Sequence, residues 1–364
     1  MSATANKQDE GIPQHAPNII EQMDVNYAQV IYSSRHWFPL FESRLTKEKE
    51  LAKLPASTLL SIDPGDHIEM RKWLVEEYMT WPRAPATEAR SRITLDVQSE
   101  TIPIAYGEGC QFAVQVHVPK TKDSGLRPAL IMYHGGGWIH GFPNVDEADF
   151  FASELRAVII NVDYRLAPEN PFPAPLNDCY EAIQWTIDHA AEYKIDKDRI
   201  GLWGCSAGGN LAAGVALRDA REHEVSRICH ANLVVPVTCH PDLYPEELKI
   251  GGSSTLSGSE QHGKVLRKLW DKYAGTQSSH EYVSVLIAST PSNHPPVHIT
   301  VAGQDGLRDE GIAYAMRLRN ASIDTQLEII PGVPHGITVP VTTHASRQFF
   351  RNQARVLDYA LNMK

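Results

Sequence analysis

From residue 91 onward, short apolar runs alternate with longer segments whose apolar residues recur at helical spacing. The short runs are strand-like and cover residues 93–98, 112–118, 129–133, 158–163, 200–203, 231–237, 297–302 and 326–330. The helical patterns cover residues 147–156, 176–193, 206–222, 309–320 and 343–361. Strands that alternate with helices are typical of a mostly parallel sheet with helices on both faces. The pattern predicts an α/β fold of eight strands that binds ligands at the carboxyl ends of its strands.

Two segments depart from this alternation. Residues 17–82 contain helical runs at 25–41 and 73–78, and residues 240–291 combine a Gly/Ser-rich stretch with an amphipathic helix near 264–273. We interpret both as parts of a helical cap over the strand ends, and surface decoration is the alternative. The expected organisation is an N-terminal cap segment at 1–90, a first core part at 91–239, a cap insertion at 240–291 and a second core part at 292–364.

Composition narrows the class of protein. The chain has 364 residues, 42% of them hydrophobic, which is enough to bury a large core. Its net charge of −10 is spread along the chain and Lys and Arg form no basic stripe, so we expect no nucleic-acid partner. Residues 1–17 are polar and no later apolar stretch is long enough to cross a bilayer, which predicts a cytoplasmic protein without stable membrane insertion. The five irregularly spaced cysteines are expected to be reduced thiols.

Two glycine-containing segments carry the candidate chemistry, His134-Gly-Gly-Gly-Trp138 and Gly204-Cys-Ser-Ala-Gly208. The second matches the Gly-x-Ser-x-Gly nucleophile elbow, in which a serine at a strand-to-helix turn exposes its hydroxyl. A strand-like run precedes it and a helical pattern follows, and the glycines leave room that a Cβ would fill. The sequence therefore predicts that Ser206 attacks a carbonyl carbon, and a tight turn with a structural serine is the alternative.

Attack on a carbonyl produces an oxyanion, which needs hydrogen-bond donors that are already in place. The N–H of Ala207 at the start of the helix is one candidate donor, and the N–H groups of Gly136 and Gly137 are the others. His134 opens the glycine loop, and we expect it to form hydrogen bonds within that loop rather than to act as a general base.

The remaining partners follow from the usual chain order of serine, then acid, then histidine. Asp305 directly follows an expected strand, whereas Asp309 and Glu310 fall in the first turn of the next helix, where the helix dipole favours a carboxylate for structural reasons. After Asp305 the chain has two histidines, His335 in a turn after the last strand and His344 at the start of the terminal helix. Loops at strand ends present catalytic groups, so Asp305 and His335 are the predicted acid and base.

These segments, with Asp163-Tyr-Arg-Leu-Ala-Pro-Glu169 and Asp305-Gly-Leu-Arg-Asp-Glu310, resemble the hormone-sensitive-lipase-like family of α/β-hydrolases, which includes microbial and fungal carboxylesterases. The resemblance runs from about residue 130 to 336. It implies the α/β-hydrolase fold, a cap, a triad of Ser206, Asp305 and His335, and oxyanion donors at Gly136, Gly137 and Ala207. The chain departs from the family at Cys205, where an acidic residue is usual, and we expect this side chain to point away from the substrate.

Trp138 and Phe142 are candidates to line an apolar substrate pocket. Aromatic residues of the expected N-terminal cap are further candidates: Trp37, Phe38, Trp73 and Tyr78. Core packing is the alternative for each of them. We expect no cofactor. We also expect no metal, because the pairs Cys229-His230 and Cys239-His240 flank an apolar strand that would hold them about 30 Å apart, too far to share one ion.

The expected function is that of a carboxylesterase-type serine hydrolase, which cleaves an ester, lactone or thioester through an acyl-enzyme on Ser206, with secondary metabolism as one setting. An acyltransferase or a lactone-forming or product-releasing enzyme is the alternative, because the cap and water access choose the acyl acceptor. A non-catalytic receptor on the same scaffold is disfavoured because no triad position is missing. The expected partner is a small, apolar ester or acyl substrate, and a homodimer stays open.

Overall fold

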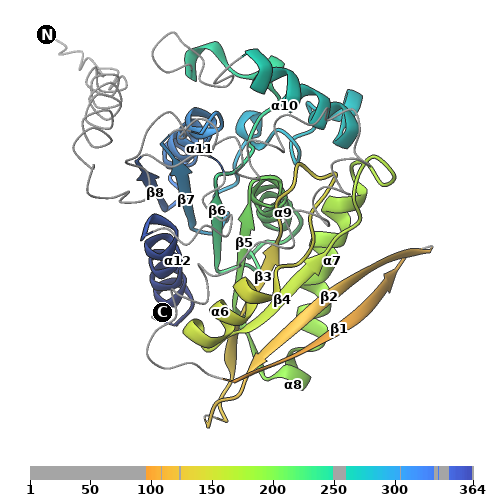
Figure 1. Cartoon of the computed structure of the whole chain (residues 1–364), viewed down its shortest axis with the longest axis vertical. Coiled ribbons are helices and arrows are strands. Elements are labelled where there is room, and N and C mark those ends of the chain that lie inside the picture. Colours follow the sequence, from red (N-terminus) through yellow and green to blue (C-terminus); the bar gives the residue numbers. More distant parts are fainter. Residues whose placement is uncertain are drawn as a thin grey trace, which may run out of the picture.

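The computed structural model describes residues 96–107, 109–122, 124–248, 260–303, 305–331, 335 and 344–362. Within these ranges eight strands form one twisted sheet (Figure 1). They are β1 (Val97–Tyr106), β2 (Cys110–Pro119), β3 (Arg127–Tyr133), β4 (Val158–Asp163), β5 (Ile195–Cys205), β6 (His230–Val234), β7 (Val297–Ala302) and β8 (Thr325–Ile330). The expected cap segment at 1–90, with Trp37, Phe38, Trp73 and Tyr78, lies outside the described residues.

The strand order is β1-β2-β4-β3-β5-β6-β7-β8. β2 runs antiparallel to both β1 and β4, whereas all other neighbouring pairs are parallel. The inner strands carry apolar side chains on both faces, and β3, β4, β6 and β7 are buried almost throughout. Because the carboxyl ends of parallel strands meet at one edge, the loops after β3, β5, β7 and β8 converge there.

Helices cover both faces of the sheet (Figure 1). They are α6 (Val145–Leu155), α7 (Ala174–Asp188), α8 (Ala190–Tyr193), α9 (Ala207–Glu222), α10 (Glu260–Tyr273), α11 (Arg308–Asn320) and α12 (His344–Asn362), with short 3-10 helices η3 (Pro241–Leu243), η4 (Glu246–Leu248), η6 (Gly275–Gln277) and η7 (Val285–Ile287). One hydrophobic cluster packs α7, α9 and α11 on one face, and a second packs α6 and α12 on the other. The predicted eight-stranded, mostly parallel sheet between helices is confirmed.

The first strand differs from its prediction. We expected it at 93–98, whereas β1 spans Val97–Tyr106 and pairs with β2 along its whole length. Most of its side chains are exposed, so it lacks the continuous apolar run that marks the inner strands. Pro103 is tolerated because an edge strand leaves one row of backbone groups without a neighbouring strand.

Two other strands differ from their predictions in their bounds. β5 spans Ile195–Cys205 rather than the expected 200–203, and residues 196–199 in its added first part are polar and at least partly exposed. β6 ends at Val234 rather than at residue 237. Val235 has a φ of 40°, which lies in the left-handed region and turns the chain out of the sheet.

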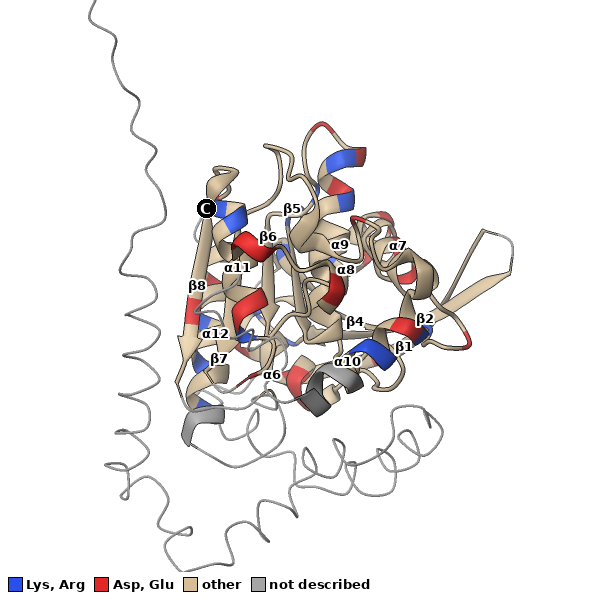
Figure 2. Cartoon of the chain, turned by 90° about the horizontal axis from the view of Figure 1, so that it is seen from above, with Lys and Arg blue, Asp and Glu red and all other residues tan. Residues whose placement is uncertain are grey.

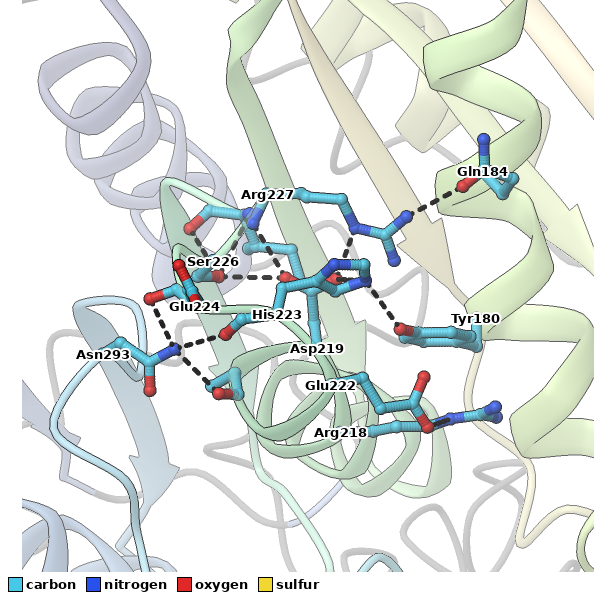
Figure 3. A network of polar contacts seen from close by, with 12 residues as sticks. Tyr180, Gln184, Arg218, Asp219, Glu222, His223, Glu224, Ser226, Arg227 and Asn293 are labelled. Carbon is cyan, nitrogen blue, oxygen red and sulfur yellow. Dashed lines mark hydrogen bonds and ion pairs between the residues drawn. The ribbon is translucent and has the colours of Figure 1, made fainter.

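A buried polar network fixes the carboxyl-terminal end of α9 (Figure 3). The fully buried carboxylate of Asp219 accepts hydrogen bonds from the Arg227 backbone N–H at 2.8 Å and from Arg227 Nε at 2.7 Å. The side-chain amide of Asn293 donates to the carbonyl oxygens of Ala220 at 2.7 Å and His223 at 2.8 Å. These carbonyls belong to the last turn of α9 and its cap, where the helix itself supplies no donors. The network therefore anchors the helix that begins after Ser206.

Charged side chains are interspersed on the described helices, and Figure 2 shows Lys and Arg beside Asp and Glu on α10 and α12. None of the described helices is both long and apolar enough to cross a bilayer. The five cysteines all lie within the described ranges, and none of them forms a disulfide.

Candidate active site

Ser206 lies at the sharp turn between the end of β5 and the start of α9. Its φ of 57° and ψ of −118° are strained for a residue with a side chain, as a nucleophile elbow requires. An ideal Cβ on Gly204 would lie 2.1 Å from the Gly208 carbonyl oxygen, and one on Gly208 would lie 2.0 Å from the Tyr133 carbonyl oxygen. The turn therefore requires glycine at both positions, and Gly208 lets α9 pack against the end of β3.

The structure brings Ser206, His335 and Asp305 together from three loops at the carboxyl edge of the sheet. The hydroxyl oxygen of Ser206 lies 2.8 Å from His335 Nε2, and His335 Nδ1 lies 2.8 Å from Asp305 Oδ2. The other Asp305 oxygen accepts the backbone N–H of Leu307 at 2.9 Å, which orients the buried carboxylate. Because a carboxylate only accepts, Nδ1 carries the proton of the ring, and Nε2 is left to accept a hydrogen bond from the Ser206 hydroxyl.

The surroundings of His335 suit a group that must gain and lose a proton. Burial lowers the pKa of His335, but the charge of Asp305 and the hydrogen bond to it raise the pKa, and the result lies above the ordinary value. The imidazole side chain still keeps 39% of its surface exposed. The Asp305 carboxylate therefore favours the protonated, imidazolium form of His335.

The glycine loop after β3 folds tightly against the elbow. Gly136 and Gly137 have φ values of 117° and 59°, both in the region that favours glycine. The Gly136 carbonyl oxygen accepts the N–H of His140 at 3.1 Å, and a Cβ on Gly136 would lie 2.1 Å from the His140 oxygen. A Cβ on Gly135 would lie 3.4 Å from the Cβ of Ser206. The loop that carries the candidate oxyanion donors therefore lies so close to the candidate nucleophile that little more than a methyl group would fit between Gly135 and Ser206.

His134 braces this loop, as the sequence predicted. Its Nδ1 donates to the Gly135 carbonyl oxygen at 2.7 Å, and its ring stacks on Tyr164 at 4.2 Å between centroids. The Tyr164 hydroxyl donates to the His134 carbonyl oxygen at 2.7 Å. Burial lowers the pKa of His134 to about 4, so the ring is neutral at physiological pH. Tyr164 comes from the 163–169 segment, which gives that segment a loop-bracing role.

Trp138 does not line an open pocket, contrary to the sequence-based expectation. None of its side chain is exposed, and its ring stacks on Tyr273 with 4.4 Å between centroids and 4° between planes. Trp270 packs on it as well, at 4.8 Å. Both partners belong to α10, so the helix covers Trp138. Phe142 is partly exposed in the loop before α6, and its role in substrate binding stays a prediction.

Cys205 and the two alternative acids, Asp309 and Glu310, have surroundings that differ from those of Ser206, His335 and Asp305. Cys205 is buried in the hydrophobic cluster on the α6 and α12 face of the sheet. Asp309 accepts from Arg308 Nε at 2.9 Å, and the fully buried Glu310 accepts the N–H of Thr238 at 2.6 Å. Burial raises the pKa of Glu310 well above its ordinary value, which favours the neutral acid. The side chain of His344 lies outside the described residues.

Asn210 is a supporting residue for which the sequence analysis assigned no role. Its side-chain amide donates to the carbonyl oxygens of Val237 at 2.9 Å and Val283 at 2.7 Å. It thereby links the first turn of α9 to the segments that follow β6 and precede β7. Its place at the end of the Gly204-to-Asn210 segment is the signal that could have indicated it. Among the described residues, no group of three or more His, Cys, Asp or Glu is placed to hold a metal ion.

A family model described as the alpha/beta hydrolase fold matches residues 130–339, which is more than half of the chain. The chain belongs to the α/β-hydrolase fold family. The match spans the glycine loop, the elbow, Asp305 and His335. The resemblance to the hormone-sensitive-lipase-like members of this family is confirmed, because the relatives are esterases of that kind.

Three proteins that are similar to this α/β-hydrolase, two in sequence and one in solved structure, are esterases. The chain is 31% identical over 235 residues to an ethyl acetate hydrolase from Pseudomonas putida, covering 63% of this chain and 72% of that one. It is 31% identical over 219 residues to a versiconal hemiacetal acetate esterase from Aspergillus parasiticus, covering 58% and 67%. A hyperthermophilic esterase from Pyrobaculum calidifontis superimposes with a TM-score of 0.70 at 26% identity, over 85% and 96% of the two chains. The chain is therefore a carboxylesterase-type hydrolase.

Proposed function

We propose that this hydrolase cleaves a carboxylic ester through an acyl-enzyme on Ser206. The observation that carries the proposal is the chain of two 2.8 Å contacts from the Ser206 hydroxyl through His335 to Asp305. A serine hydroxyl is a weak nucleophile at neutral pH, and a histidine base within hydrogen-bond distance activates it.

The proposed reaction has two halves. As the Ser206 oxygen bonds to the carbonyl carbon, its proton moves to His335 Nε2, and the carbonyl oxygen becomes an oxyanion. The N–H groups of Gly136, Gly137 and Ala207 are the proposed donors to that oxyanion. Collapse of the tetrahedral species breaks the bond to the alcohol oxygen, which leaves with the proton from His335. Water then loses a proton to His335 and attacks the acyl carbon, which releases the acid and restores Ser206.

The substrate that we propose is a small, apolar ester. Two of the relatives are named for acetate esters, which makes a short acyl group the first choice for an assay. We also propose that residues 240–291 form a cap insertion, because the part of this segment that is described includes α10, whose Trp270 and Tyr273 cover Trp138 next to the glycine loop.

Replacing Ser206 by alanine tests the mechanism. We expect kcat for p-nitrophenyl acetate to fall at least about 10⁴-fold in Ser206→Ala, because no other group replaces the nucleophile. Ser279→Ala is the matched control, since Ser279 is an exposed serine of the same protein. Wild type treated with a fluorophosphonate should gain one adduct at Ser206. Undiminished turnover in Ser206→Ala would refute the acyl-enzyme, and a product ester formed with an added alcohol in place of the acid would favour acyl transfer.

A further inference from the structure

Four large apolar residues of α10 differ in how far their side chains are buried. Leu266, Trp270 and Tyr273 are almost fully buried, whereas Leu269 is only partly buried. Figure 1 shows α10 across the top of the fold, above the sheet and α9. The buried group is accounted for by the core, where Trp270 and Tyr273 pack on Trp138. Leu269 also packs against this core, but part of its surface stays exposed.

Leu269 lies directly over Gly137. A Cβ built on Gly137 would meet the two methyl groups of Leu269 at 3.0 and 3.1 Å, closer than nearly all real contacts of a Cβ. The space beside the Gly137 backbone is therefore already filled by this leucine. Because the Gly137 N–H is a proposed oxyanion donor, an ester whose carbonyl oxygen binds there has Leu269 as a neighbour close to the reacting carbon.

The position of α10 relative to the glycine loop is held rigidly. Trp138 follows Gly137 in the chain and stacks on Tyr273 at 4.4 Å, one helical turn after Leu269. The backbone N–H of Phe172 donates to the Tyr273 carbonyl oxygen at 2.7 Å, which fixes the end of the helix from a second direction. A bound ester therefore meets Leu269 as a fixed wall, since stacked aromatic rings resist displacement of the helix.

We propose that Leu269 determines substrate specificity by excluding esters that are branched next to the carbonyl group. The inference rests on the proposed esterase function and deepens it. A wall at the far end of a pocket would limit chain length, whereas a wall over an oxyanion donor limits bulk at the first carbon on either side of the ester. The favoured substrates are esters with unbranched groups at that position.

The test compares isomeric esters that differ only in branching. One pair is p-nitrophenyl butanoate and 2-methylpropanoate, which changes the acid, and the other is propyl and isopropyl acetate, which changes the alcohol. For each pair we take the ratio of kcat/KM for the branched ester to that for the linear ester. In Leu269→Ala we expect this ratio to rise about tenfold in one pair, as for a methyl-sized difference in an apolar site. Leu269→Phe should lower the same ratio.

Leu266→Ala is the matched control, because it removes the same atoms from the same helix at a position inside the core. Its melting temperature should fall, while both ratios stay within twofold of wild type. Ratios that do not move in folded Leu269→Ala, or that move equally in Leu266→Ala, would overturn the proposal. Wild type that hydrolyses neither linear ester would instead overturn the esterase function itself, so the two failures are distinguishable.

Discussion

Replacing Asp219 by alanine should destabilise the protein strongly while leaving the chemistry of its folded fraction intact. The Asp219 carboxylate is fully buried and holds Arg227 through its backbone N–H and its guanidinium (Figure 3). Ser226 also donates to Asp219, at 3.1 Å. Alanine removes all three acceptor contacts and leaves the guanidinium of Arg227, whose side chain is only 18% exposed, without its counter-charge.

The size of the effect follows from burial. Breaking a buried ion pair by removing one partner costs about 3–5 kcal/mol, because the remaining charge has lost both water and its partner. Arg227 keeps some contact with water and also donates to Gln184 at 2.9 Å, so we expect the free energy of unfolding to fall by about 3 kcal/mol, the lower end of this range. At about 2 °C per kcal/mol for a large domain, the melting temperature should fall by about 6 °C.

Urea unfolding and thermal melts of four proteins measure this: wild type, Asp219→Ala, Arg227→Met and the double variant. The double variant has no buried charge without a partner, so it should be more stable than the sum of the single losses predicts, by at least about 1 kcal/mol. Asp219 lies about 18 Å along α9 from its first residue, so the rate of fluorophosphonate labelling at Ser206 per folded molecule should not change. A loss under about 1 kcal/mol in Asp219→Ala, or strictly additive losses, would refute the reasoning.

Two further predictions concern the site. Gly208→Ala should prevent folding or abolish activity, because its Cβ would lie 2.0 Å from the Tyr133 carbonyl oxygen. The control is Gly107→Ala, which should cost only about 1 kcal/mol in urea unfolding, because Gly107 has a φ of 54° and no atom near the position of a Cβ. Equal losses in the two variants would contradict the steric explanation. In wild type, kcat/KM should rise with pH through a pKa above about 6.5, because the neutral form of His335 is the proposed base. In Asp305→Asn the inflection should move to lower pH, and kcat should fall about 10⁴-fold. The stabilisation from the raised pKa of His335 has the opposite trend, being complete below about pH 6.5 and lost as pH rises through the folded-state pKa. A profile that does not shift in Asp305→Asn would show that Asp305 does not act on His335.

The inner strands could be predicted from sequence, because a strand that is buried on both faces has a continuous run of apolar residues. β4 and β7 have the bounds that the runs at 158–163 and 297–302 predict. β1 could not be located, because an edge strand with mostly exposed side chains and a proline carries no such run. Its pairing depends on β2, so only the folded sheet defines where it begins and ends.

The proximity of Ser206, His335 and Asp305 could be anticipated from chain order, since parallel strands carry their following loops to one edge. The surroundings of these residues could not. Trp138 was a candidate for the pocket with core packing as the alternative, because an aromatic residue beside a glycine loop suits either place. The choice is made by Trp270 and Tyr273, more than a hundred residues further along the chain. The burial of Glu310 likewise depends on the segment that follows β6.

In the proposed mechanism, the position of Trp138 links oxyanion stabilisation to substrate specificity. Gly137 carries a proposed oxyanion donor, and Leu269 fills the space that a Cβ on Gly137 would need, while the next residue stacks on the helix that carries Leu269. We therefore expect any change that moves α10 to displace the backbone of Gly137 and its N–H as well. The width of the site and the stabilisation of the oxyanion are not independent properties, because both depend on the same stack. Substitutions that enlarge the site by displacing α10 should lose rate on every ester, whereas substitutions that shorten Leu269 without moving the helix can change selectivity alone. For this reason we expect a substitution at the partly buried Leu269, and not at the buried Trp138, to alter specificity alone.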